Sequence, residues 1–276
     1  MRMGSVRRMS APSATTTRER FRALHDADAT FVMPNPWDIG SAKLLESLGF
    51  PALATTSSGL AASLGKHDQN LSRDELVAHV ASLTAAIGVP LNVDAERCYS
   101  DTLDGIAETV TLLADAGAAG CSIEDYDPAI GGVDELGKAT ERVAAAATAA
   151  HAHGVLLTAR AEAHLYGAAD ISATITRLTS FRDAGADAVY APGLVDLGEI
   201  RRVVDEVGLP VNVLMFPAGP SVGELEAIGV RRISTGGALA WAAYGALVRA
   251  ATELRDTGAA TYAHGGLSRH DRHAFD

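Results

Sequence analysis

Short apolar runs alternate with longer amphipathic stretches along most of this sequence. Eight of the runs have the length of buried strands, and they lie at 31–35, 52–57, 91–96, 120–125, 155–161, 188–192, 211–215 and 231–235. Apolar runs without polar alternation are typical of a parallel sheet that is covered on both faces. Stretches with helical periodicity lie between the runs, and a last one spans roughly 238–256.

Glycines separate the helical stretches from the strands that follow them. They stand at the end of seven helical stretches, as Gly49, Gly88, Gly117, Gly154, Gly185, Gly208 and Gly229. Glycine is favoured just past a helix end, because it readily adopts a left-handed backbone conformation. Two helix starts carry the pattern of a capping box, Ser72 with Glu75 and Ser221 with Glu224.

This regular alternation predicts an α/β fold with one (β/α)8 barrel of the TIM type. An open, doubly wound sheet is the alternative. We expect the barrel to occupy residues 19–256, between a disordered N-terminal tail over 1–18 and a C-terminal tail over 257–276.

Composition and charge narrow the class of protein. Apolar residues make up 47% of the chain, which excludes wholesale disorder, and the formal net charge is −11. This acidic balance argues against nucleic-acid binding, which requires clustered Lys and Arg. No apolar run reaches the ~18 residues of a membrane span. The basic N-terminus is not followed by the apolar region of a signal peptide. We therefore expect a cytoplasmic protein that binds neither nucleic acid nor membranes.

Acidic residues gather where predicted strands end, which is where barrel enzymes carry their active sites. Asp94 and Glu96 are two residues apart on one run, so we expect their side chains to point the same way, and Glu124 ends the next run. Three carboxylates at one rim repel one another unless a cation holds them, and such hard oxygen ligands suit Mg²⁺ or Mn²⁺. Alternatively, these acids cap helices or pair with Arg97 and Arg160.

Other polar residues at the same ends are candidates for binding a small anionic substrate. Arg160 offers a planar fork for a carboxylate or phosphonate. The triplet Ser58-Gly59-Leu60 is predicted to present backbone N–H groups, although a plain loop fits it equally well. Asn212 is either a ligand for a substrate oxygen or a satisfied buried amide. Asp68 is either a catalytic acid or base above the pocket or a solvated turn residue.

Taken together, the motifs resemble the isocitrate lyase and phosphoenolpyruvate mutase superfamily over about residues 30–250. The resemblance rests on Asn35-Pro36-Trp37-Asp38, Ser58-Gly59-Leu60, Val93-Asp94-Ala95-Glu96, Ile123-Glu124-Asp125 and Ala159-Arg160-Ala161-Glu162. It implies a Mg²⁺-dependent enzyme that makes or breaks a C–C or P–C bond beside a 2-oxo carboxylate, through an enolate-like intermediate. It also implies a homotetramer whose last helix is exchanged between subunits.

The same resemblance assigns roles to individual residues. Asp94, Glu96 and Glu124 match the metal-binding acids, Arg160 matches the substrate-binding arginine, and Asp68 matches a catalytic-loop aspartate. The Ser58-Gly59-Leu60 backbone would help to hold the intermediate.

Two positions depart from the family pattern. Glu96 stands where an aspartate is usual, and the loop over 126–137 lacks the cysteine that protonates the leaving carbanion in the lyase branch. We therefore expect a mutase, hydrolase or decarboxylase. The alternatives are a C–C lyase of the isocitrate or 2-methylisocitrate type with another acid, and a non-catalytic relative that binds a carboxylate.

Overall fold

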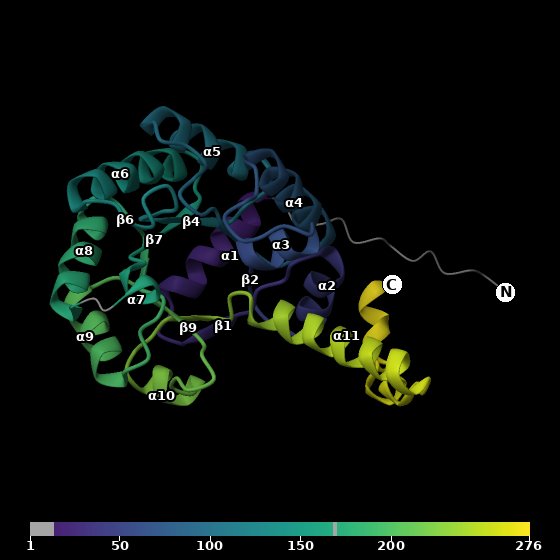
Figure 1. The fold of residues 1–276 in the computed structure, drawn as a ribbon. Coiled ribbons are helices and arrows are strands. Elements are labelled where there is room, and N and C mark those ends of the chain that lie inside the picture. The colour runs from purple at the N-terminus through teal and green to yellow at the C-terminus, as the bar shows by residue number, and fades with distance from the viewer. Residues whose placement is uncertain (1–13, 168–169) are drawn as a thin grey trace.

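Eight parallel strands form the wall of a nearly closed barrel in the computed structural model, which describes residues 14–167 and 170–276 (Figure 1). The strands are β1 (Phe31–Met33), β2 (Leu53–Ala54), β3 (Leu91–Asp94), β4 (Gly120–Glu124), β7 (Leu156–Arg160), β8 (Ala188–Tyr190), β9 (Val211–Leu214) and β10 (Arg232–Ser234). Each coincides with a predicted strand, so the barrel prediction is confirmed. The open sheet is excluded because β10 pairs with β1. The remaining seam is bridged by the Ala54 N–H, which donates to Pro34 O at 3.1 Å.

Helices surround the barrel on the outside (Figure 1). They are α2 (Ile39–Ser47), α4 (Arg73–Ala86), α5 (Leu103–Asp115), α6 (Leu136–Ala152), α8 (Ile171–Asp183), α9 (Leu197–Val207) and α10 (Val222–Ala227), and a longer helix, α11 (Ala238–Thr257), follows the last strand. Both predicted capping boxes are present, at Ser72 and at Ser221. Of the seven junction glycines, all have positive φ except Gly88. At Gly88 the chain instead leaves the helix through an extended Ile87.

Three shorter elements interrupt the connections that follow the strands. Helix α3 (Ser57–Ser63) follows β2, the antiparallel pair β5 (Tyr126–Asp127) and β6 (Gly132–Val133) follows β4, and helix α7 (Ala163–Tyr166) follows β7. All three therefore lie at the carboxyl end of the barrel, where the predicted site is located.

The first helix, α1 (Ala14–Asp26), crosses the barrel in Figure 1. Phe21 on this helix is fully buried among residues of the barrel interior, including Phe31 and Leu156. Arg18 anchors the helix by donating to the carbonyls of Ala118 and His153. Residues 14–18 therefore belong to a helix and not to a disordered tail, and the rest of that predicted tail lies outside the described residues.

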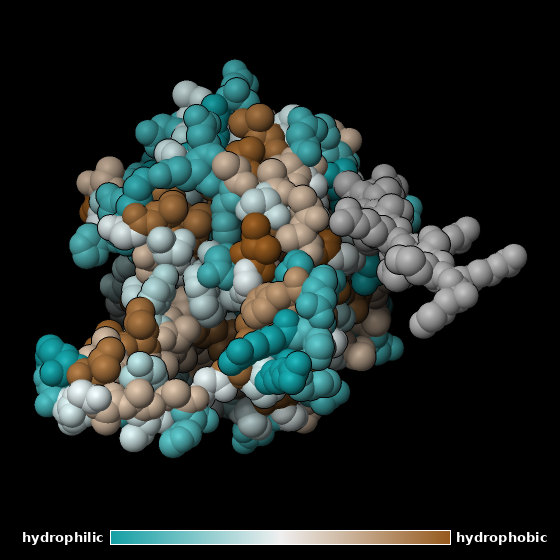
Figure 2. Space-filling view, turned by 90° about the vertical axis from the view of Figure 1, so that its right-hand side faces the viewer, coloured by the Kyte–Doolittle hydropathy of each residue, from teal (hydrophilic) through white to brown (hydrophobic). Residues whose placement is uncertain are grey.

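The last helix, α11, points away from the barrel (Figure 1) and buries Ala240 but leaves Trp241, Leu247 and Leu254 exposed. Figure 2 faces the side of the molecule that carries α11, and apolar residues lie there among hydrophilic ones. The predicted C-terminal tail contains two short 3-10 helices, η1 (Thr261–Gly265) and η2 (Asp271–Phe275), and η2 packs against α2. Within the described ranges, no helix combines the length and apolarity that a membrane crossing needs.

Candidate active site

A polar cavity of about 140 Å³ opens at the carboxyl ends of the strands. Its outer part is lined by Asp68, Asp94 and Arg160. Its inner part is lined by Asn212 and Arg232, which stand near the start of strands β9 and β10. The cavity is thus lined by charged and amide groups, unlike the branched apolar side chains that fill most barrels of this kind.

Arg160 brings the predicted acids together. Its Nη1 lies 2.6 Å from Asp94 Oδ1, its Nη2 lies 3.3 Å from Glu124 Oε2, and its Nε lies 2.7 Å from Glu162 Oε1. The acids therefore pair with Arg160, as the alternative to a metal site in the sequence analysis expected. A guanidinium has five N–H groups, so two remain for a substrate anion.

Glu96 reaches the site by a different route from the one that the sequence indicated. Strand β3 ends at Asp94, and Glu96 has a φ of +47°, so strand alternation does not orient its side chain. Cys98 and Tyr99 also have positive φ, a conformation that is costly for residues other than glycine. The Glu124 N–H holds this turn by donating to Glu96 O at 2.9 Å.

The Glu96 side chain is 5% exposed, and its Oε1 has no hydrogen-bond partner in the described part of the chain. Burial, and after it the nearby charges of Asp94 and Asp68, raise the pKa of Glu96 to about 8. A carboxylate in such surroundings is stabilised by a cation.

A divalent metal fits this donor set, although not as a ready-made cage. Residues 14–167 and 170–276 contain no group of three His, Cys, Asp or Glu placed to coordinate a metal directly. Mg²⁺ commonly keeps several waters and is held by only one or two carboxylates. The hard oxygens of Asp94, Glu96 and Glu124, with the unpartnered Glu96 Oε1, meet that requirement.

The loop between α3 and α4 supplies two residues to the site. Asp68 lines the mouth of the cavity, where partial desolvation and the charge of Asp94 raise its pKa. Gln69, which the sequence did not single out, has a φ of +63° and donates from Nε2 to Glu124 Oε1 at 3.1 Å. No local pattern distinguished Gln69, because its role depends on a strand far away in the sequence.

The Ser58-Gly59-Leu60 triplet forms the first turn of α3 and is not an open loop. The Leu60 N–H donates to Thr56 O, and the Gly59 N–H is directed at Thr56 Oγ1. The prediction that all three N–H groups face a substrate is therefore wrong for Gly59 and Leu60, because the helix uses them. Ser58 does line the cavity.

Asn212 is a satisfied buried amide in this structure. Its Oδ1 accepts from Arg232 Nε at 2.9 Å, and its Nδ2 donates to Ser234 Oγ at 3.0 Å. The proposed ligand role for a substrate oxygen is therefore not supported, and Asn212 instead orients Arg232.

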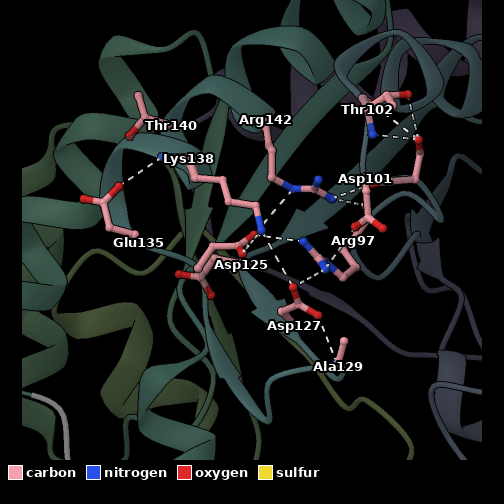
Figure 3. Close-up of polar contacts among 12 residues, drawn as sticks. Arg97, Asp101, Thr102, Asp125, Asp127, Ala129, Glu135, Lys138, Thr140 and Arg142 are labelled. Atoms are coloured by element: carbon pink, nitrogen blue, oxygen red, sulfur yellow. Dashed lines mark hydrogen bonds and ion pairs between the residues drawn. The ribbon is translucent and has the colours of Figure 1, made fainter.

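The loop over 126–137, called the lid below, contains the β5–β6 hairpin and is held by ion pairs (Figure 3). Arg97 contacts Asp127 at 2.7 Å and Asp134 at 3.0 Å, and Lys138 contacts Asp134 at 2.7 Å. These contacts connect the hairpin to the segment that carries Glu96.

An aromatic pair lies beside this cluster. Tyr126 of the hairpin stacks on Tyr166 of α7, with ring centroids 3.7 Å apart and nearly parallel rings. The loops after β4 and β7 therefore meet at the site.

Two reactive side chains on loops near the carboxyl ends of the strands, Cys98 and His164, do not line the cavity. Burial raises the pKa of the Cys98 thiol to about 12, so it stays protonated and is not a nucleophile. His164 Nε2 lies 2.8 Å from Thr174 Oγ1, so its ring contacts helix α8.

A parallel barrel with acids and an arginine at its carboxyl rim defines a small-molecule enzyme that binds an anion. Residues 21–255 match the model of the phosphoenolpyruvate phosphomutase family. The chain belongs to the phosphoenolpyruvate mutase and isocitrate lyase superfamily and is an enzyme of that group.

The chain is also similar to individual proteins. The crystal structure of a candidate lyase/mutase from Burkholderia cenocepacia has a TM-score of 0.90 and 46% identity, covering 95% of this chain and 96% of that one. An uncharacterised protein of Mycobacterium tuberculosis is 34% identical over 223 residues, 78% of this chain and 81% of its own length. The oxaloacetate decarboxylase of Paraburkholderia xenovorans is 32% identical over 241 residues, 83% of this chain and 76% of its own length.

Proposed function

We propose that this enzyme is Mg²⁺-dependent and cleaves a C–C or P–C bond in a small 2-oxo acid or phosphonate through an enolate-like intermediate. Decarboxylation of oxaloacetate or a close analogue is the reaction we favour. The observation that carries the proposal is the contact of Arg160 with Asp94, Glu124 and Glu162 in a cavity of about 140 Å³. The similarity to an oxaloacetate decarboxylase supports the same choice.

The residues of the chain divide the work between binding and proton transfer. The free N–H groups of Arg160 bind the carboxylate next to the 2-oxo group, and Ser58 lines the same cavity. Asp94, Glu96 and Glu124 would hold Mg²⁺, which supplies positive charge where the enolate oxygen develops. Asp68, whose pKa is raised, carries or accepts a proton at the mouth.

Decarboxylation makes few demands on the lid. The bond between C3 and C4 breaks, its electrons form the enolate, carbon dioxide leaves, and water can protonate C3. Cleavage of an isocitrate instead leaves a carbanion that requires a positioned acid, worth roughly 10²–10⁴-fold. Residues 126–137 contain no Cys, His or Lys, and Cys98 is buried. We therefore expect negligible turnover of isocitrate and 2-methylisocitrate.

The test is a substrate panel with purified protein and Mg²⁺, using oxaloacetate, phosphonopyruvate, isocitrate and 2-methylisocitrate. A protein-free reaction with Mg²⁺ corrects for spontaneous decarboxylation. Asp94→Ala should abolish turnover, whereas Asp205→Ala, an exposed acid on α9, should not. Cleavage of either isocitrate at ~1 s⁻¹ or faster would contradict the proposal, as would turnover that withstands complete removal of divalent metal.

A further inference from the structure

Arg232 is a buried cation at the inner end of the cavity. It lies on β10, is 2% exposed and lines the cavity. Its Nε donates to Asn212 Oδ1 at 2.9 Å, its Nη2 donates to Thr158 Oγ1 at 2.9 Å, and its Nη1 lies 3.2 Å from His25 Nε2. The guanidinium is therefore held on three sides.

None of these partners carries a negative charge. The His25 Nδ1 lies 2.9 Å from Phe21 O and donates to it, so Nε2 is the acceptor that Arg232 uses. Burial, followed by the charge of Arg232, lowers the pKa of His25 to about 3, so the imidazole is neutral. Asn212 and Thr158 are neutral by nature, and the site retains a full positive charge.

Other buried arginines in the structure do not show this arrangement. Arg97 pairs with Asp127 and Asp134, Arg142 approaches Asp134, and Arg160 pairs with several acids. Among the described residues, by contrast, no carboxylate lies within ion-pair distance of Arg232. Burying an unpaired charge is costly, and an anion in the adjoining cavity would offset that cost.

Arg232, at the inner end of the cavity, and Arg160, at its outer end, lie on the same barrel wall and are linked by strand pairing. The strand register pairs Arg160 with Tyr190, Tyr190 with Asn212, and Asn212 with Arg232. The Arg160 guanidinium lies over the Tyr190 ring, 5.3 Å from its centroid. Two guanidiniums thus border one small cavity, which is the arrangement expected for a ligand with two negative ends.

We propose that Arg232 forms a second anion-binding position, which receives the distal carboxylate of a 2-oxo dicarboxylate while Arg160 binds the carboxylate next to the 2-oxo group. A free small anion such as chloride has the same chemistry and is the other possible source. The choice of a dicarboxylate rests on the proposed function, whereas the existence of the anion position does not.

The experiment compares two 2-oxo acids, of which only one carries a distal carboxylate, and follows how each responds to the same substitutions. Binding of 3,3-difluorooxaloacetate and of 2-oxobutyrate is measured by calorimetry with Mg²⁺, for the wild type, Arg232→Met and Arg232→Lys. We expect Arg232→Met to weaken the dicarboxylate by about 10- to 100-fold and 2-oxobutyrate by less than about threefold, because charge-assisted hydrogen bonds are lost for one ligand only. Arg232→Lys should recover part of the difference.

A chloride titration at constant ionic strength, with a bulky sulfonate in place of a carboxylate as the replacement anion, separates the two sources. If chloride raises the Tm of the wild type but not of Arg232→Met, the group bound by Arg232 is a free anion. If Arg232→Met selectively weakens binding of the dicarboxylate and chloride has no such effect, the group bound by Arg232 is the substrate carboxylate. Equal weakening of both ligands together with no chloride effect overturns the proposal. If the wild type binds neither ligand, the proposed function fails, and the chloride arm still decides the anion position.

Discussion

Replacing Arg97 with Gln tests whether the lid hairpin and the Glu96 segment form one unit. The side chains of Arg97, Asp127 and Asp134 are 11%, 9% and 1% exposed, so the contacts among them are largely shielded from water. Removing one partner of a buried ion pair destabilises a protein by about 3–5 kcal/mol. Lys138 still contacts Asp134, and we therefore expect a loss near the lower end, about 3 kcal/mol of unfolding free energy.

The same substitution should weaken metal binding. Arg97 follows Glu96 directly, and residues that orient metal ligands from outside typically change affinity by about 10–100-fold. We expect Arg97→Gln to reduce Mg²⁺ affinity about tenfold, because the left-handed turn at Glu96 loses its attachment to the hairpin. Arg97→Lys should recover part of both losses, since it keeps the charge but not the planar fork.

Urea unfolding and calorimetric Mg²⁺ titration measure the two effects. The matched control is Arg202→Gln, which breaks an ion pair between Arg202 and Glu206 whose side chains are 44% and 45% exposed. That change should alter stability by no more than about 0.5 kcal/mol. An Arg97→Gln protein that loses less than about 1 kcal/mol and binds Mg²⁺ normally would refute the coupling.

Three further outcomes are expected. Because burial lowers the pKa of His25 from 6.5 to about 3, its contribution to stability is complete above pH 6.5 and falls by about 1.4 kcal/mol per unit below it. The unfolding free energy, measured by urea titration, should therefore fall more steeply between pH 7 and pH 5 for the wild type than for His25→Gln. An equal fall in the two proteins would contradict this. Asp94→Ala should abolish Mg²⁺ binding in calorimetry, and unchanged affinity would remove Asp94 as a ligand. We also propose that the exposed side of α11 mediates a homotetramer, so Trp241→Glu with Leu247→Glu should lower the mass seen in sedimentation, and an unchanged mass would rule that side out.

The local pattern of the sequence was sufficient to predict the barrel and the end that carries the site. Apolar runs and junction glycines act over a few residues, so the eight strands and both capping boxes are where the pattern placed them. Parallel strands then bring their carboxyl ends to one rim, and this is why Asp94, Glu124 and Arg160 meet.

What the local pattern did not decide depends on groups far apart in the chain. Glu96 is turned into the site by a left-handed backbone conformation that contacts with β4 stabilise. Gln69 reaches Glu124 from a loop 55 residues away, and His25 reaches Arg232 across 207 residues. Hydropathy and spacing describe neighbours in the sequence, whereas these hydrogen bonds and buried charges exist only after the barrel has closed. Tertiary structure alone therefore placed a cation at the inner end of the cavity.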